Sequence, residues 1–323
     1  MISGRMRIVF MGTGEICLPT LRWLLDRRSE LPLVAIYTQP DKPVGRKQIL
    51  TASPVKSAAK EAAVPVFQPE LFRKDTGAVR GLEELRPDLV VVMAYGQILP
   101  RGVIAAPSRA CVNLHASLLP RHRGASPVQA AIREGDERTG ITLMHVAPKL
   151  DSGDMILKES LPVLPHDTGG SLHDRLADLG PLVMARGLSL FERGDPPSEP
   201  QDESLVTYSG KLVREDGLVD WTEDAPSIER LVRAYDPWPG TYSTLELGGK
   251  SRKLKIYPPV TPLPDAVAPP GAIAARDGAL VVACGEGSVR LAGDVQLEGR
   301  RRLAASDFLR GVEIPEGSVF GRR

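Results

Sequence analysis

Apolar runs and amphipathic stretches alternate along the first 190 residues. Compact apolar runs predict strands over residues 6–11, 33–38, 64–67, 88–94, 110–115, 140–147 and 155–161. Helical patterns predict helices over residues 16–25, 54–62, 76–85, 127–134 and 168–191. The run over 88–94 is apolar throughout, which is typical of a parallel strand buried on both faces. This alternation predicts an α/β fold with a Rossmann-like parallel sheet.

The pattern changes after residue 193. Residues 194–203 are rich in proline and polar side chains and show no periodicity, which indicates a linker. A short helix is predicted over 228–235, followed by strands over 242–247, 253–257, 271–275, 279–283 and 288–295. Short strands separated by turns favour a small barrel of the OB type. We therefore expect a catalytic domain over 1–193, a linker over 194–208 and a β-barrel domain over 209–323.

Composition places the chain among ordinary globular proteins. Its 323 residues are 42% hydrophobic and 25% charged, and no apolar run is long enough to span a membrane. The N-terminus lacks the features of a secretory signal, and the three cysteines are widely separated. These observations predict a cytoplasmic protein without disulfides or a metal site, and we expect a monomer. The net charge of +1 gives no global support for nucleic-acid binding.

Residues 110–128 contain the most informative chemistry. Asn113 and His115 lie two apart in a predicted strand, so both side chains project from one face while Leu114 points away. The amide can donate to a carbonyl oxygen that gains negative charge, and the imidazole can donate or carry a proton. That pairing suits a reaction at a carbonyl group. The alternative, left open by spacing alone, is a strand end whose polar groups cap a turn.

Two other stretches invite a specific interpretation. Gly12 and Gly14 follow the first strand as in dinucleotide-binding proteins, but Cys17 occupies the position of the third glycine. We therefore favour a tight strand-to-helix turn over an NAD site. Residues 39–48 carry three cations, and their two prolines and glycine predict a loop without regular structure. It is either a solvated surface loop or a mobile arm that engages phosphate.

Several of these stretches resemble the folate-dependent formyltransferases. Residues 113–115, 117–121 and 123–127 are similar to the family's first signature, and residues 150–154 are similar to its second. The Asp-Pro-Trp-Pro-Gly-Thr stretch over 236–241 and residues 296–311 resemble its C-terminal domain. The likeness covers nearly the whole chain and is closest to the members that act on the methionine carried by initiator tRNA.

The resemblance implies an activity and a set of site residues. The expected reaction moves the formyl group of 10-formyltetrahydrofolate to the amine of methionyl initiator tRNA, without a metal. By likeness the catalytic residues are Asn113, His115 and Asp151, with the Asp151 carboxylate orienting His115 and favouring its protonated form. The folate contacts implied are Met93, Tyr95, Gly96, Ser117, Leu118, Leu119 and Pro120. Arg46 matches the family's key arginine in a loop that enters the tRNA acceptor end, and further contacts are expected from Lys42, Lys47, Lys250, Lys253 and Arg301.

Two other functions stay open at this point. The same chemistry could act on an amine of a purine precursor or of a sugar nucleotide, although the predicted barrel and the Arg46 loop favour tRNA. The chain could also be a binding module without activity, such as a folate or RNA sensor, although the complete Asn, His and Asp set argues against it. For Asp151, a turn aspartate that bonds nearby backbone N–H groups is the common structural role.

Overall fold

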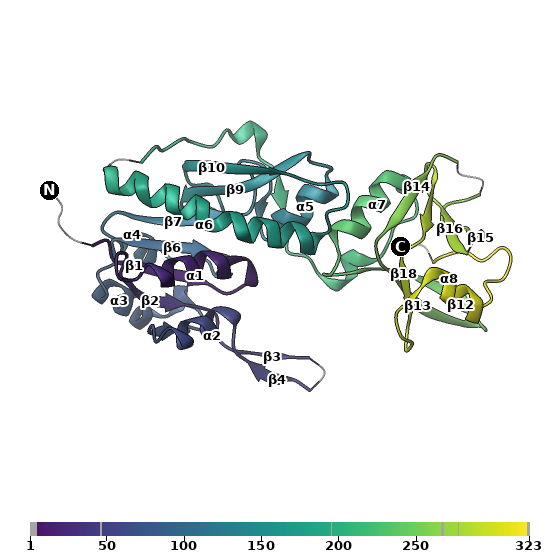
Figure 1. The fold of residues 1–323 in the computed structure, drawn as a ribbon, viewed down its shortest axis with the longest axis horizontal. Coiled ribbons are helices and arrows are strands. Elements are labelled where there is room, and N and C mark those ends of the chain that lie inside the picture. Colours follow the sequence, from purple (N-terminus) through teal and green to yellow (C-terminus); the bar gives the residue numbers. More distant parts are fainter. Residues whose placement is uncertain (1–4, 46, 195, 266–267, 277, 322–323) are drawn as a thin grey trace. The chain divides into compact units, whose positions relative to one another are not determined.

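The structure is a computed structural model that describes residues 5–45, 47–194, 196–265, 268–276 and 278–321. The chain divides into two compact units (Figure 1). The first contains the residues up to 124 together with 139–161 and 173–208. The second contains 125–138, 162–172 and the residues from 209 onward. The predicted division into a catalytic domain, a linker and a tRNA-binding domain is a division by function, and it stays a prediction.

A seven-stranded sheet with the order β10-β9-β7-β6-β1-β2-β5 forms the centre of the first unit. Its strands are β1 (Ile8–Gly12), β2 (Leu33–Tyr37), β5 (Val66–Phe67), β6 (Leu89–Met93), β7 (Ala110–His115), β9 (Arg138–His145) and β10 (Met155–Pro162). The pairs from β5 to β7 are parallel, and β9 runs antiparallel to β7. Because β2 and β6 flank β1 on opposite sides, the strand order reverses at β1. Ligand crevices of α/β sheets lie at the carboxyl ends of strands near such a reversal.

The helices of this unit are α1 (Leu18–Asp26), α2 (Pro54–Glu61), α3 (Thr76–Glu84), α4 (Arg101–Ala105) and most of α6 (Gly169–Arg193), with a 3-10 turn η1 (Glu15–Cys17) before α1. The Ser53 hydroxyl accepts a hydrogen bond from the Lys56 N–H and caps α2, with Pro54 at its first position. A Cβ on Gly12 would lie 2.7 Å from the Phe10 ring and 2.8 Å from the Cys17 sulfur. Gly12 is therefore required by the tight turn after β1. None of the helices in the described residues is long and apolar enough to cross a membrane.

The three cysteines are buried thiols. Burial raises the pKa of Cys17, Cys111 and Cys284 to about 12. At pH 8 each thiol is therefore neutral, and the reactive thiolate is scarce. We expect the native protein to react slowly with a thiol reagent such as Ellman's reagent. The unfolded protein should react at once and release three equivalents of the coloured product, one for each cysteine. Rapid reaction of the folded protein would contradict the buried placement.

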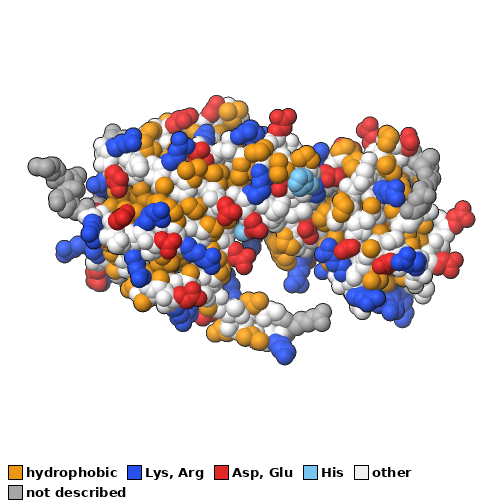
Figure 2. Space-filling view, viewed as in Figure 1, with side chains coloured by type: hydrophobic (Ala, Val, Ile, Leu, Met, Phe, Trp, Pro, Cys, Tyr) orange, Lys and Arg blue, Asp and Glu red, His pale blue; other side chains and the backbone are white. Residues whose placement is uncertain are grey.

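The predicted irregular loop is wrong, because residues 42–44 and 49–51 form the two strands of a β-hairpin. Strand β3 (Lys42–Val44) pairs antiparallel with β4 (Ile49–Thr51), and Pro43 lies opposite Leu50. A two-stranded ribbon tolerates proline because its outer edges need no N–H donors. Figure 1 shows the hairpin projecting from the sheet beyond α2. Val44, Ile49 and Leu50 are each more than half exposed, and Figure 2 shows hydrophobic side chains on the hairpin.

The second unit contains α5 (Pro127–Arg133), α7 (Ala225–Ala234), α8 (Ala305–Gly311) and two four-stranded sheets. One sheet has the order β12-β13-β18-β19 and the other β14-β17-β16-β15. Their strands are β12 (Thr241–Leu247), β13 (Lys250–Ile256), β14 (Val260–Leu263), β15 (Ile273–Arg276), β16 (Ala279–Ala283), β17 (Ser288–Leu291), β18 (Asp294–Leu297) and β19 (Leu303–Ala304). Trp221 stacks on Phe320 at 5.2 Å within their shared core.

The sequence-based fold class is confirmed, an α/β unit followed by a small antiparallel β unit. Several details of the β unit were wrong. The strand expected over 288–295 is two strands, β17 and β18, because Gly293 sits against the backbone of Tyr257 and Pro258 at the break. Strand β14 and helix α8 were not predicted. Pro262 interrupts the apolar pattern of β14, and α8 is too short for helical periodicity to show.

Candidate active site

Strand β7 carries two of the candidate catalytic side chains at its carboxyl end. Asn113 and His115 lie opposite Met144 and Thr142 of β9, and Leu114 between them is buried on the other face. His115 is buried with 6% of its surface exposed, whereas Asn113 is half-buried. The Asn113 side chain makes no hydrogen bond to another residue that the structure describes. Its amide donors are therefore available to a ligand.

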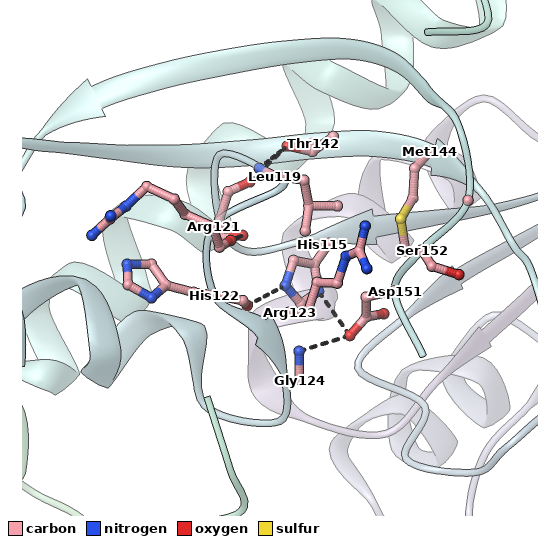
Figure 3. Close-up of polar contacts among 12 residues, drawn as sticks. His115, Leu119, Arg121, His122, Arg123, Gly124, Thr142, Met144, Asp151 and Ser152 are labelled. Atoms are coloured by element: carbon pink, nitrogen blue, oxygen red, sulfur yellow. Dashed lines mark hydrogen bonds and ion pairs between the residues drawn. The ribbon is translucent and has the colours of Figure 1, made fainter. Parts of the chain in front are cut away.

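The His115 ring lies between two acceptors (Figure 3). Its Nε2 is 2.9 Å from the His122 carbonyl oxygen, and its Nδ1 is 3.7 Å from Oδ2 of Asp151. A carbonyl oxygen can only accept, so Nε2 carries the proton in that contact. An imidazolium presents an N–H to both acceptors at once. The predicted approach of the Asp151 carboxylate to His115 is thus present, at ion-pair distance rather than hydrogen-bond distance.

Backbone conformation brings the two acceptors to the ring. Asp151 has φ +47° and His122 has φ +58°, both in the left-handed region that non-glycine residues rarely occupy. Oδ2 of Asp151 also accepts a hydrogen bond of 2.9 Å from the Gly124 N–H. Left-handed residues held by such contacts are concentrated at functional sites. Asp151 therefore bonds to a backbone N–H 27 positions away rather than to one in its own turn, and the same oxygen faces His115.

The loop after β7 is tied to β9 through Thr142. The buried Thr142 hydroxyl donates to the Ser117 carbonyl at 2.7 Å and accepts from the Leu119 N–H at 3.1 Å. Ser117 Oγ donates to the Arg121 carbonyl at 2.6 Å, and Leu119 packs into a small apolar cluster. The Leu119–Pro120 peptide bond is cis. Of the four predicted folate contacts here, Ser117 and Leu119 build the loop, while Leu118 and Pro120 are partly exposed.

The carboxyl end of β6 presents backbone rather than side chains. The Tyr95 carbonyl accepts from Thr13 Oγ1 at 3.0 Å and from Gln39 Nε2 at 2.9 Å. The Tyr95 ring is 2% exposed in the core, where burial raises the pKa of its hydroxyl. Met93 is equally buried, whereas Gly96 is exposed with φ +79°. A ligand at this edge would meet main-chain groups, as the resemblance implied.

The predicted tRNA contacts lie on two separate surfaces. Lys42 and Lys47 are exposed on the β3–β4 hairpin, and Arg46 lies outside the described residues. Lys250 and Lys253 lie on β13, where the Lys253 ammonium sits 3.7 Å from the centre of the Tyr242 ring. Arg301 is exposed between β18 and β19. The hairpin belongs to the first unit and the other three residues to the second.

Four residues around the site escaped the sequence analysis. Thr142 holds the loop after β7, and three others form a second group: Arg123, Gln201 and Thr207. Arg123 is fully buried, and Gln201 sits in the stretch predicted to be a linker. Arg123 belongs to the first signature stretch, but nothing in that stretch indicates a buried arginine, and no sequence pattern marks Gln201 directly after Pro200. Only the tertiary contacts reveal them.

Two family models match most of the chain. Residues 6–188 match the family described as "Formyl transferase", and residues 211–313 match "Formyl transferase, C-terminal domain". The chain belongs to the formyl transferase family. The family resemblance seen in the sequence is therefore confirmed, and the chain has the formyltransferase fold on a Rossmann-like sheet. Groups of His, Cys, Asp and Glu suited to a metal ion do not occur among the described residues.

Two relatives are similar over nearly their whole length. The methionyl-tRNA formyltransferase of Akkermansia muciniphila is 48% identical over 308 residues, which are 95% of this chain and 96% of the relative. That of Geotalea daltonii is 44% identical over 320 residues, covering 98% and 99%. A solved N-formyltransferase of Helicobacter canadensis shares the fold, with a TM-score of 0.63, 14% identity and coverage of 88% of this chain and 98% of that chain. HypX of Aquifex aeolicus, solved with tetrahydrofolic acid, has a TM-score of 0.59 at 20% identity, covering 99% of this chain and 51% of that chain.

Proposed function

We propose that this formyl transferase moves the formyl group of 10-formyltetrahydrofolate to the amino group of methionyl initiator tRNA. The observation that carries the proposal is the 48% identity to a methionyl-tRNA formyltransferase over 95% of this chain, because the match includes both units. The product is formylmethionyl initiator tRNA for translation initiation. A cytoplasmic monomer is part of the same proposal.

The residues at the end of β7 have the chemistry that formyl transfer needs. A neutral amine attacks the formyl carbon, and negative charge develops on the formyl oxygen. The Asn113 amide donates to that oxygen, and the nearby His115 ring, when it carries a positive charge, stabilises the developing negative charge electrostatically. The Asp151 carboxylate, 3.7 Å from Nδ1, orients the His115 ring. Asp151 or a water that it positions accepts the proton of the attacking amine. Collapse of the tetrahedral intermediate then breaks the bond between the formyl carbon and N10 of the folate, and N10 takes up a proton as tetrahydrofolate leaves.

The folate supplies the activated one-carbon unit. The residues present fit this co-substrate in two respects. The half-buried Asn113 amide has no partner among the described residues, and the edge at Gly96 offers exposed main chain. Ile98 is 68% exposed beside that edge and offers an apolar surface for a flat ring. We assign folate contacts to Met93, Tyr95 and Gly96 through their backbone, and to the loop over 117–120.

The tRNA is assigned to the hairpin and to the basic residues of the β unit. Exposed aliphatic side chains and lysines lie together on the hairpin, which suits apolar contact with bases and attraction to phosphates. Lys250, Lys253 and Arg301 lie on or near neighbouring strands β13 and β18 of one sheet. Lysines and arginines on such a surface bind the phosphate backbone in a salt-dependent manner. Arg46 is assigned to the same role by likeness.

A double change on the hairpin separates tRNA binding from stability. Ile49 and Leu50 are 62% and 67% exposed, so Ile49→Ser with Leu50→Ser changes the free energy of unfolding by no more than about 0.5 kcal/mol. We expect the KM for tRNA to rise about tenfold while the KM for folate stays constant. Steady-state kinetics and thermal denaturation measure both effects. Leu182→Ser, at a leucine of α6 that is 49% exposed, is the matched control. An unchanged KM for tRNA would remove the hairpin from the interface.

A formyl-transfer assay tests the proposed function directly. Purified protein receives 10-formyltetrahydrofolate with methionylated initiator tRNA, methionylated elongator tRNA or small amines such as amino-sugar nucleotides. Selective formylation of the initiator tRNA is the expected result. Transfer only to a small amine would keep the roles of Asn113, His115 and Asp151 but refute the tRNA assignment. No transfer to any acceptor would refute the enzymatic proposal.

A further inference from the structure

Residues 199–207, which we call the bracing segment, contact Asp151 and His122, the two residues whose oxygens flank the His115 ring. The segment begins at Glu199, whose backbone N–H donates to the Met155 carbonyl at 2.9 Å and whose carbonyl accepts from the Met155 N–H at 2.8 Å. It lies wholly within the first unit. Two of its residues, Gln201 and Thr207, reach the backbone beside the candidate site, each from a different side. The bracing segment is thus part of the site's surroundings rather than a free linker.

Gln201 holds the loop that carries Asp151. Its Nε2 donates to the Asp151 carbonyl and to the Gly153 carbonyl, each at 2.8 Å. Its Oε1 accepts from Arg123 Nε at 2.9 Å. These partners fix the orientation of the amide, since a guanidinium can only donate and a carbonyl can only accept. Both amide hydrogens are therefore committed to the Asp151 loop.

Arg123 closes this set of contacts into a ring. Its side chain binds Gln201, Gln201 binds the backbone of Asp151, and the Asp151 carboxylate accepts from the N–H of Gly124, the next residue after Arg123. Arg123 is fully buried and also donates to Glu203 at 2.8 Å. A displacement of any member of the ring therefore moves the Asp151 carboxylate relative to His115.

Thr207 holds the other acceptor. Its Oγ1 accepts from the His122 N–H at 2.9 Å, and its carbonyl accepts from the Arg123 N–H at 2.9 Å. The His122 carbonyl, which accepts from His115 Nε2, is thereby fixed on the opposite side of the ring from Asp151. His122 keeps a left-handed φ of +58°, a conformation that needs such support.

We propose that Gln201 and Thr207 are positioning residues that hold the two acceptors of His115 in place for formyl transfer. The inference rests on the proposed function, because it assigns these residues to the same site. They do not touch the substrates and act through Asp151 and His122. The alternative is a structural segment that only closes the surface over β10. The two roles differ in their effects on kcat, on the KM values and on the state of the His115 ring.

Three substitutions distinguish these roles. Gln201→Glu keeps the size and the acceptor for Arg123 but places an oxygen against two carbonyl oxygens. Thr207→Val keeps the shape and removes the acceptor of the His122 N–H, and Thr207→Ser restores it. The control within the same segment is Ser204→Ala, because the Ser204 hydroxyl donates to the exposed Asp202 rather than to the residues around His115.

The expected result is a selective loss of kcat. A misplacement of about 1 Å in a reacting group can cost about 100-fold, so we expect Gln201→Glu and Thr207→Val to lower kcat by about 10- to 100-fold. Both KM values should stay within about twofold, and Thr207→Ser and Ser204→Ala should resemble the wild type. Activity equal to that of Ser204→Ala, or a rise in KM that accounts for the loss, would overturn the proposal.

A spectroscopic measurement makes the test independent of the acceptor. In protein labelled with ¹⁵N-histidine, the His115 ring of the wild type should show a protonated Nε2 in one well-defined environment. Gln201→Glu and Thr207→Val should shift or broaden that signal, while Ser204→Ala leaves it unchanged. An unchanged signal in both variants would overturn the positioning role. This signal tests the positioning role of Gln201 and Thr207 even if the wild type formylates no tRNA. The proposed function and this inference can therefore fail separately.

Discussion

Replacement of His115 by glutamine is expected to reduce kcat about 1,000-fold with little change in folding. Glutamine can still donate to the His122 carbonyl, which lies 2.9 Å from His115 Nε2, but it cannot carry the positive charge that faces Asp151. Proton transfer and charge stabilisation by a positioned side chain each contribute factors of this order. Single-turnover formyl transfer and the KM for each substrate measure the effect.

The control is His173→Gln. His173 is a partly exposed residue of α6 that pairs with Asp174. We expect it to retain the activity and the melting temperature of the wild type. A His115→Gln protein that keeps more than about a tenth of the wild-type kcat would exclude a catalytic role for the imidazole.

Gly153→Ala is expected to damage both stability and activity. A Cβ at residue 153 would lie 1.8 Å from the His145 carbonyl oxygen and 2.7 Å from its carbon. Both are backbone atoms that cannot rotate away, so the loop carrying Asp151 must shift by about 1 Å or more. We expect a loss of about 2–3 kcal/mol in the free energy of unfolding from the overpacking. The accompanying displacement of Asp151 should lower kcat about 100-fold.

Gly81→Ala provides the matched comparison in the same unit. Gly81 lies inside α3, and an added Cβ meets nothing within 4 Å. Alanine is favoured over glycine in a helix, so this change should raise stability by roughly 0.5–1 kcal/mol and leave activity unchanged. Chemical denaturation followed by fluorescence or circular dichroism compares the two. Equal stabilities for both variants would show that the loop after β9 adapts, contrary to the tight contact with His145.

The fold was largely readable from local pattern because strand and helix periods reflect burial. Continuous apolar runs placed β1, β6 and β7 within two residues of their observed bounds. The period of two put Asn113 and His115 on one face of β7, as observed. The β3–β4 hairpin was missed because Pro40 and Pro43 make strand formation in this stretch unfavourable by pattern. The outer edge of a two-stranded ribbon has no neighbouring strand. A proline whose nitrogen faces that edge therefore loses no backbone hydrogen bond.

The site was readable only in part. Asp151 lies 36 positions after His115, and nothing in that spacing indicates that the two side chains meet; the family likeness alone suggested it. Gln201 and Arg123 form their contact across 78 positions, and both side chains are buried against the tendency of their residue types. Such contacts depend on the path of the chain after α6, which brings residues 199–207 beside β10 and Arg123. Local sequence patterns do not predict that path. Arg46 could not be placed because it lies outside the described residues.

The bracing segment also bears on the order in which the protein is made. Asn113, His115 and Asp151 are all synthesised before α6, whereas Gln201 and Thr207 follow it. A nascent chain that has emerged only as far as residue 193 contains the three side chains, but it lacks the ring through Gln201 and the acceptor for the His122 N–H. The contacts around His115 are therefore completed late in synthesis, when residues 199–207 return to pair with β10 and the turn at Arg123.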